Sequence, residues 1–227
     1  MEKIFALKNA SLFKDLSSSE LELIENISIS KNFKKGEHIF FQGEPLVNVY
    51  FIQEGLVKVY RNDANGREQI VSILSKDELF PHVGFFRDGT YPAFAQAIEQ
   101  TKMIKIPKNR FEEILITNPE LCVKLFKVLG EKIMDLQTRL EAQILNNTYE
   151  QIIKLLIRLG ESHGKNMKNG KVYLDVNVTN QDLAKMIGTS RESISRTFSK
   201  LKKQKLLFEE KSGYSFYPEE LLNELLQ

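Results

Sequence analysis

The chain has 227 residues, of which 42% are hydrophobic and 27% charged, with a net charge of +2, so it is expected to form a soluble globular protein with room for two domains. No apolar run approaches the roughly 18 residues of a membrane helix, and the first residues lack the apolar core of a signal peptide. A single cysteine, Cys122, excludes an internal disulfide and a four-cysteine cluster within one chain. We therefore expect a cytoplasmic protein without membrane contacts.

The first 107 residues change from a helical period to a period of two. Short helices are expected within 4–28, the second of them capped by Ser17 or Ser18. Glycines separate the segments that follow, and Asn65-Gly66 is a strong hairpin signal. Strands are predicted at 49–52, 56–60, 69–74, 94–98 and 103–106. Many short strands at near-regular spacing indicate a small antiparallel roll or barrel.

A long helix is predicted from Pro119 to about Asn146, since proline suits the first turn of a helix. Apolar residues along it alternate in steps of three and four, as in a coiled-coil seam. These residues are Phe126, Leu129, Ile133, Leu136 and Leu140. The stripe fits a dimer seam or packing on the chain's own roll. After it, Thr148 is expected to cap a further helix that runs through Leu159.

The segment 179–205 has the pattern of two short helices joined by a tight turn. Thr179 and Asp182 have the spacing of a capping box, and Gly188 is suited to end the first helix. Ser190 can cap a second helix, whose inner face holds Ile194, Phe198 and Leu201. Two such helices with a glycine-containing turn are typical of a helix-turn-helix.

The outward side chains of the second helix suit DNA. Arginine can donate two hydrogen bonds to guanine, and glutamate can accept one from cytosine. The base-contacting residues are predicted to be Arg191, Glu192, Ser195 and Arg196. Between 185 and 205 the chain has seven basic residues against one acid, a balance that suits phosphates. The predicted phosphate contacts are Thr189, Ser190, Ser193, Lys200 and Lys203.

Short strands flank this motif. A strand is expected at 172–176 before it, and after it the segments 206–208 and 214–217 are expected to pair across a turn at Ser212-Gly213. This hairpin would form a wing behind the second helix. A short helix is expected from Pro218 to Gln227. Because a helix-turn-helix that reads two half-sites requires a dimer, we favour the dimer interpretation of the long-helix stripe.

This order of parts resembles the Crp/Fnr family of bacterial transcription regulators over nearly the whole chain. The resemblance rests on KKGEHIFFQGE (34–44), FIQEGLVKVYRNDANGRE (51–68) and TNQDLAKMIGTSRESISRTFSKLKKQKLL (179–207). It implies an α+β protein with a β-roll sensor domain at 1–118, a dimerisation helix at 119–147 and a winged helix-turn-helix at 148–227. It also implies a homodimer on a palindromic promoter site, with RNA polymerase as a further partner.

Within the resemblance, Glu192 and Arg196 match the base-contacting pair of the family's recognition helix. Arg191 matches the extra arginine of the cyclic-AMP receptor branch, whereas Ser195 matches the serine of the oxygen-responsive branch. We favour a TGTGA-like half-site over a TTGAT-like one.

The sensor region departs from the cyclic-AMP branch. His82 stands where that branch has a glutamate for the ribose, and Pro92-Ala93 stand where it has an Arg-Ser pair for the phosphate. Without a donor for the phosphate, cyclic AMP is not expected to bind, and the cysteines of the iron–sulfur branch are absent. An effector pocket would involve His82, Val83, Phe85, Tyr91 and Pro92, and no cofactor is assigned.

Several alternatives stay open for the sensor. His82 could ligate a haem, Cys122 could be a redox switch, a small metabolite could bind among the aromatic residues, or the regulator could be constitutive. A cupin-like metal enzyme would need clustered histidines, but His38, His82 and His163 are widely separated, so neither enzymatic activity nor a metal site is expected. A module that docks protein rather than DNA is disfavoured by the arginines of the recognition helix.

Overall fold

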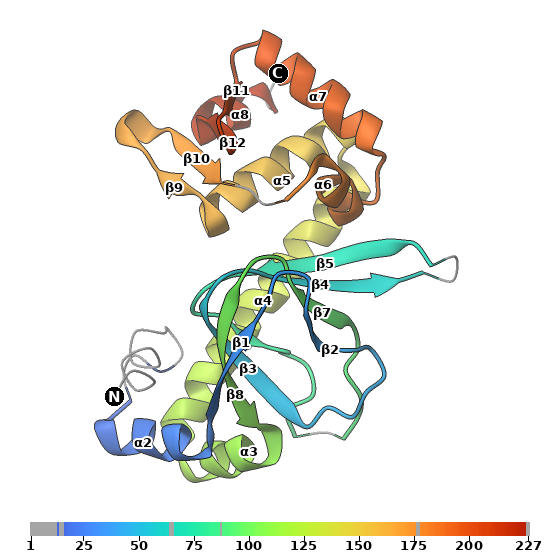
Figure 1. The fold of residues 1–227 in the computed structure, drawn as a ribbon. Helices are drawn as coiled ribbons and strands as arrows, with labels where there is room; N and C mark the ends of the chain where they lie inside the picture. Colours follow the sequence, from blue (N-terminus) through green and yellow to red (C-terminus); the bar gives the residue numbers. More distant parts are fainter. Residues whose placement is uncertain (1–12, 14–15, 64–65, 87, 176–177, 226–227) are drawn as a thin grey trace. The chain divides into compact units, whose positions relative to one another are not determined.

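The computed structural model describes residues 13, 16–63, 66–86, 88–175 and 178–225 (Figure 1). The chain divides into two compact units, Met1–Asp135 and Leu136–Gln227. Most of the first helical segment expected before Ser17 lies outside the described residues, as do Asn65 of the predicted hairpin turn and Val176 of the predicted strand. The three-part division into 1–118, 119–147 and 148–227 stays a prediction.

The first helix described, α2 (Ser18–Ile27), begins with a capping box at Ser17 rather than at Ser18. The Ser17 hydroxyl accepts from the Glu20 N–H at 3.3 Å, and the Ser17 N–H donates to Glu20 Oε2 at 2.7 Å. Two of the free N–H groups at this end are thereby satisfied. Leu21 and Ile24 are buried, whereas Leu23 faces solvent.

In the described part of this unit, eight strands follow and form two antiparallel four-stranded sheets, in the orders β1-β8-β3-β6 and β2-β7-β4-β5. Their bounds are β1 Ile29–Phe33, β2 His38–Phe40, β3 Asn48–Glu54, β4 Val57–Asn62, β5 Glu68–Leu74, β6 Leu79–Phe80, β7 Phe94–Ala97 and β8 Thr101–Pro107. This arrangement confirms the predicted roll and its α+β class. Strands β1, β2 and β6 were not expected from the sequence.

Two apolar clusters hold this unit together. One fills the roll, where the rings of Phe40 and Tyr91 stack with their centres 3.9 Å apart. The other lies between the sheet that contains β3 and β8 and the helices α2, α3 (Lys108–Thr117) and α4 (Pro119–Leu145). Leu121 and Leu125 of α4 are buried in this second cluster. The beginning of α4 is therefore part of the roll's own core.

The second unit is built on α5 (Thr148–His163), which Asn147 caps, so the expectation of a Thr148 cap is wrong. The Asn147 side chain accepts from the Glu150 N–H at 3.1 Å, and the Asn147 N–H donates to Glu150 Oε2 at 3.2 Å. Glu150 lies three residues after Asn147, which is the spacing that a capping box needs. The helix runs past Leu159 to His163. Gly160 lies within this last part and leaves room for the ring of Phe216, which is only 2.8 Å from where a Cβ would stand.

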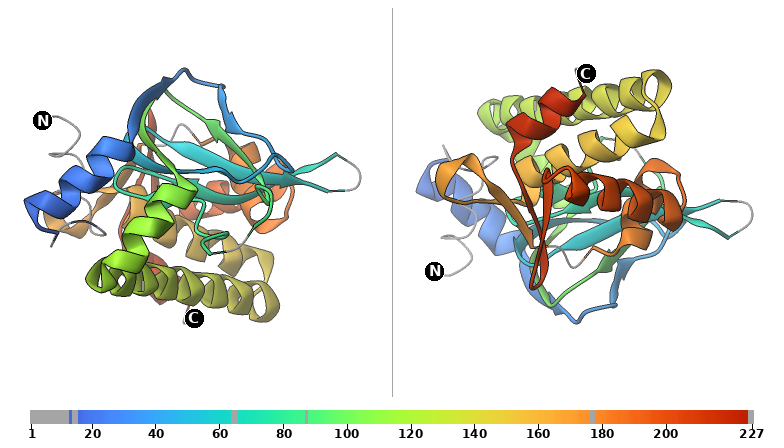
Figure 2. Two further views of the ribbon diagram at one scale, coloured as in Figure 1. Left: turned by 90° about the horizontal axis from the view of Figure 1, so that it is seen from below. Right: turned by 90° about the horizontal axis from the view of Figure 1, so that it is seen from above.

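The remaining elements of this unit form a helix-turn-helix with a small sheet of order β11-β12-β10-β9. They are β9 Lys165–Asn166, the 3₁₀ turn Lys168–Gly170, β10 Val172–Asp175, α6 Asn180–Ile187, α7 Arg191–Lys203, β11 Leu207–Glu210, β12 Gly213–Phe216 and α8 Pro218–Glu224. Helix α7 contacts both α6 and β11, as the right-hand view of Figure 2 shows. The wing predicted behind the second helix is thus the hairpin β11–β12.

Candidate nucleic-acid interface

The caps of the two helices hold α6 and α7 at a tight turn. Thr179 Oγ1 accepts from the Asp182 N–H at 3.2 Å, and the Thr179 N–H donates to Asp182 Oδ2 at 2.9 Å, which confirms the predicted capping box. Gly188 ends α6 with φ +71° and ψ 35°, a left-handed conformation in which a Cβ would be strained. Ser190 caps α7 by accepting from the Ser193 N–H at 3.2 Å.

The inner face of α7 fixes which side chains point outward. Ile194, Phe198 and Leu201 are buried as predicted, and Thr197 is buried beside them. On α6, Leu183, Ala184 and Met186 are buried, and Ile187 is half-buried. Because 3.6 residues make one turn, the opposite side of α7 is left as one continuous surface.

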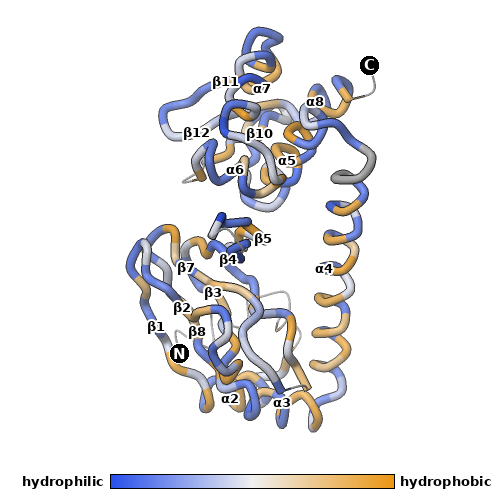
Figure 3. Tube along the Cα trace, turned by 90° about the vertical axis from the view of Figure 1, so that its right-hand side faces the viewer, coloured by the Kyte–Doolittle hydropathy of each residue, from blue (hydrophilic) through white to orange (hydrophobic). Residues whose placement is uncertain are grey.

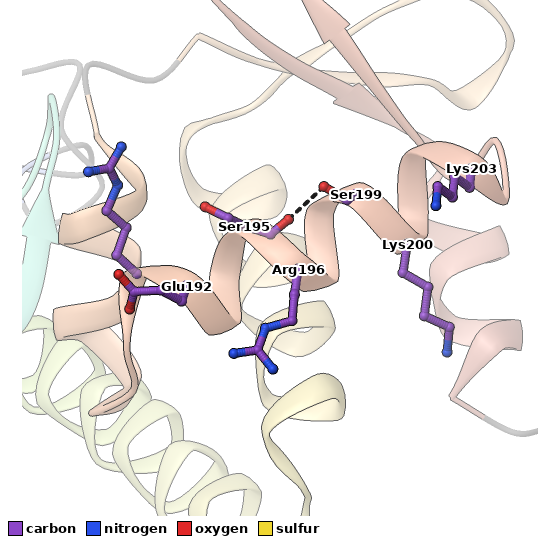
Figure 4. A pocket seen from close by; sticks show the side chains of 7 residues that line it. Glu192, Ser195, Arg196, Ser199, Lys200 and Lys203 are labelled. Carbon is purple, nitrogen blue, oxygen red and sulfur yellow. Dashed lines mark hydrogen bonds between the residues drawn. The ribbon is translucent and has the colours of Figure 1, made fainter.

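This outer surface of α7 brings together the residues predicted to contact bases and two of those predicted to contact phosphates (Figure 4). It is lined by Arg191, Glu192, Ser195, Arg196, Ser199, Lys200 and Lys203. We call this set the α7 surface. Ser199 was missed in the sequence, although it follows Ser195 by one helical turn and donates its hydroxyl proton to the Ser195 carbonyl at 2.9 Å.

Charge on the α7 surface favours an anionic partner. Four of its seven side chains are cationic and one, Glu192, is acidic. Hydrogen bonds from its own backbone N–H and from Ser190 lower the pKa of Glu192, with further help from Arg191 and Arg196. The carboxylate therefore stays ionised near neutral pH and can only accept hydrogen bonds, as a cytosine amino group requires.

The other predicted phosphate contacts lie at the beginning of α7. Thr189 and Ser190 form the turn between the helices, and Ser193 lies in the first helical turn. The hydroxyls of Ser190 and Ser193 are 3.1 Å apart. Lys202, in contrast, points toward the wing, where it pairs with Glu209 and lies over the ring of Tyr214. Lys202 therefore lies on a different side of α7 from Lys200 and Lys203, which line the α7 surface.

The residues predicted to line an effector pocket lie in different surroundings. Tyr91 is in the core of the roll, with its hydroxyl donating to the Asn48 carbonyl at 3.0 Å. Phe85 packs against the second cluster, next to Phe111, while Val83 and Pro92 are exposed. The structure therefore does not gather these side chains into one described group, and the effector pocket stays a prediction.

His82 has an unusual environment within that set. Its Nε2 atom is enclosed and has no hydrogen-bond partner among the described residues. Burial, with a smaller contribution from the positive charge of Lys132, lowers the pKa of His82 to about 4, although Glu78 acts in the opposite direction. The imidazole is therefore neutral at physiological pH. Haem ligation by His82 stays one of the open alternatives for the sensor.

The apolar stripe of α4 is divided between solvent and core. Phe126, Ile133, Leu136 and Leu140 are between 53% and 66% exposed. Leu129 is instead half-buried against the second cluster of the roll. Figure 3 shows hydrophobic segments recurring along α4. Cys122, one helical turn before Phe126, is half-buried.

Two further observations concern the other classes of function. Among the described residues, no helix is long and apolar enough to cross a membrane. In the same part of the chain, no three His, Cys, Asp or Glu side chains lie close enough together to hold a metal ion.

A double-sheeted roll joined through a long helix to a winged helix-turn-helix defines a class of DNA-binding regulators with an N-terminal sensor-type domain. Residues 30–118 match the cyclic nucleotide-binding domain family, and residues 150–216 match the Crp-like helix-turn-helix domain family. The chain belongs to the Crp/Fnr family and is a DNA-binding transcription regulator of that type.

Individual relatives match this chain over most of their length. The chain is 29% identical to the anaerobic regulatory protein of Bacillus subtilis over 201 residues, which cover 88% of this chain and 84% of the relative. It is 23% identical to a CRP-like cAMP-activated global transcriptional regulator of Mycobacterium tuberculosis, with 88% of each chain covered. Among solved structures, FixK2 from Bradyrhizobium japonicum superimposes with a TM-score of 0.76 at 18% identity, covering 87% of this chain and 96% of that one.

Proposed function

We propose that the protein binds a palindromic, TGTGA-like promoter site as a homodimer through the α7 surface. The observation that supports this proposal best is that Arg191, Glu192 and Arg196 share one open face with two lysines. The arginines and the glutamate supply the donors and the acceptor for base edges, and the lysines supply charge for phosphates. A bacterial regulator with this partner would act in the cytoplasm and would contact RNA polymerase.

Dimerisation is supported by the exposed side of α4. Three of its exposed apolar residues, Phe126, Ile133 and Leu140, recur every seven residues and therefore lie along one line of the helix. Exposed apolar stripes of this kind normally mark an interface. A dimer that reads two half-sites must place its two recognition helices about one DNA turn, roughly 34 Å, apart.

The sensor domain is proposed not to bind cyclic AMP. At the positions that the family resemblance assigns to the phosphate, Pro92 is exposed and Ala93 is buried, and neither side chain can donate a hydrogen bond. At the ribose position, His82 has its Nε2 atom enclosed. A cyclic phosphate there would lose its hydration without receiving donors from these side chains.

The test is fluorescence anisotropy of the ligand-free protein on a TTGTGA-N-TCACAA duplex, with a scrambled duplex and a TTGAT-type duplex as competitors. Replacing Arg196 by alanine should weaken specific binding by roughly 1–3 kcal/mol and relax the preference at one base. Lys154→Ala, which removes an exposed positive charge from α5, is the matched control and should retain base preference. Equal losses in both variants would contradict direct base contact by Arg196.

The same titration bears on regulation. Tight, selective binding by the ligand-free protein would favour a constitutive regulator or one that an effector switches off. Weak binding to the TGTGA-type, the TTGAT-type and the scrambled duplex alike would indicate that an activating effector is missing. Titrating cyclic AMP into the protein should leave the affinity unchanged, and a large increase would overturn the proposal about the sensor.

A further inference from the structure

The ammonium group of Lys200 lies in a small cluster built by other elements of the second unit. Its Nζ atom is 3.8 Å from the centre of the Tyr149 ring and 3.8 Å from Glu224 Oε1. Tyr149 is in the first turn of α5, and Glu224 is the last residue of α8. Lys200 itself is part of the α7 surface, on the same side of the helix as Arg196 (Figure 4).

The acidic member of this cluster is fixed in place. Glu224 Oε1 accepts hydrogen bonds from the Tyr149 hydroxyl at 2.7 Å and from Gln204 Nε2 at 3.0 Å. These two hydrogen bonds, and then the charge of Lys200, lower the pKa of Glu224. The carboxylate side chain is only 15% exposed, whereas the lysine side chain is 55% exposed. A fixed anion and a fixed ring thus hold a cation that still faces solvent.

We propose that Tyr149, supported by Glu224 and Gln204, positions Lys200 for a backbone phosphate of DNA at the edge of the α7 surface. This inference rests on the proposed DNA-binding function. The Lys200–Glu224 contact of 3.8 Å occupies at most one of the three N–H donors of the ammonium, so the others remain for a phosphate oxygen. The aromatic ring attracts the cation through its face and uses none of those donors.

Positioning matters because a lysine is a long, flexible side chain. A lysine that is free in solvent loses its rotamer freedom when it binds a phosphate, whereas one that is already held has less to lose. The cluster also connects the start of α5 with the recognition helix. Tyr149 is therefore a positioning residue, and Lys200 makes the contact.

The experiment is a double-mutant cycle on the palindromic duplex, measured by anisotropy across a salt series. Tyr149→Leu should weaken binding about threefold, the size of an exposed cation–π contact, with the salt slope unchanged because Lys200 still reaches the phosphate. Lys200→Gln should lower the salt slope by about 0.9. In the Lys200→Gln background, Tyr149→Leu should have no further effect. Tyr149→Phe keeps the ring and should restore most of the affinity.

Three results would overturn the inference. An equal loss from Tyr149→Leu in both backgrounds would mean that Tyr149 has only a structural role. An unchanged affinity in Tyr149→Leu would mean that the cluster does not assist binding. If Glu224→Gln binds more tightly than Glu220→Gln, a matched charge change on an exposed residue of α8, then Glu224 competes with DNA for Lys200.

Two checks complete the design. Thermal unfolding followed by circular dichroism would show whether each variant is folded. If Tyr149→Leu is unfolded, Tyr149→Phe and Glu224→Gln still test the inference. A wild-type protein that does not distinguish the palindromic duplex from the scrambled one would overturn the proposed function, whereas the phosphate contact of Lys200 is independent of sequence and would still be tested by the same cycle on either duplex. Selective wild-type binding without the Tyr149 effect would overturn the inference alone.

Discussion

The half-buried imidazole of His82, whose Nε2 atom is enclosed, predicts an acid-sensitive roll. The unfolded chain takes up the proton of a histidine near pH 6.5, whereas burial in the folded roll lowers the pKa of His82 to about 4. Between these two values the unfolded state binds more protons than the folded state, so stability falls as the pH falls. Each pH unit in this window costs about 1.4 kcal/mol, so lowering the pH from 7 to 5 should cost the roll about 2 kcal/mol.

The assay combines a direct titration with a stability measurement. The chain has only three histidines, so the His82 ring signal can be assigned in NMR spectra by its loss in His82→Gln. Its chemical shift should stay that of a neutral ring down to about pH 5. Urea unfolding of the wild type and of His82→Gln, at pH 7 and at pH 5, should show the extra loss of about 2 kcal/mol in the wild type alone.

Two results would refute this reasoning. A His82 signal that titrates near pH 6.5 would show that the ring is accessible to water and that its enclosure does not persist in solution. A loss of stability of equal size in His82→Gln would assign the acid sensitivity to another group. In that case Glu78, which opposes the shift at His82, would be the next residue to replace.

Two further predictions concern the dimer and the roll. Ile133→Glu, in the exposed stripe, should convert a dimer to a monomer in sedimentation equilibrium, because it would place two like charges in the seam. Thr138→Glu, a change at another exposed position of α4, should leave the dimer intact. A dimer that survives Ile133→Glu would show that the interface lies elsewhere. Gly55→Ala should destabilise the roll by about 2–5 kcal/mol in urea unfolding, because Gly55 has φ +96° and a Cβ would lie 2.5 Å from Thr101 Oγ1. Gly66→Ala, at φ +75° with nothing within 4 Å, should cost only about 1–2 kcal/mol, and equal losses would contradict a steric cause at Gly55.

The helix-turn-helix was predictable because its signals are local. Capping side chains bond backbone groups two or three residues away, so Thr179 and Ser190 could be assigned without knowledge of the fold. Gly188 could be assigned because glycine readily takes the left-handed conformation that ends a helix. The error at α5 arose where two capping residues are adjacent. Asn147 and Thr148 both suit a cap, and the position of Glu150 decides between them.

The roll was predictable in kind but not in detail. Strands β1 and β2 are short, and β1 is exposed at every residue except Phe33, so neither shows the apolar alternation on which strand prediction depends. Their pairing comes from partners more than fifty residues away in the chain, such as Lys105 opposite Ile29. A local pattern cannot contain such information.

The candidate sites show the same division. The outward face of α7 followed from helical spacing, and six of its seven residues were predicted. The surroundings of Tyr91 and Phe85 depend on which of two core clusters each ring enters, and Leu129 faces the roll because of how α4 packs. The cluster around Lys200 joins residues up to 75 positions apart, such as Tyr149 and Glu224, and no spacing rule connects them.

The two faces of α4 restrict how a signal can pass along it. Leu121 and Leu125 are embedded in the core, so the beginning of the helix cannot roll about its own axis without withdrawing both side chains from their cluster. Emptying one leucine site typically costs about 2–5 kcal/mol, which is a large fraction of a whole domain's stability of about 5–15 kcal/mol. Farther along, Lys132 is tied to Glu78 by a 2.6 Å ion pair, which can break and re-form at little cost. The beginning of α4 is thus fixed to the core. Any signal from the roll would therefore reach the far end of α4 as bending or sideways movement of the helix rather than as rotation about its axis.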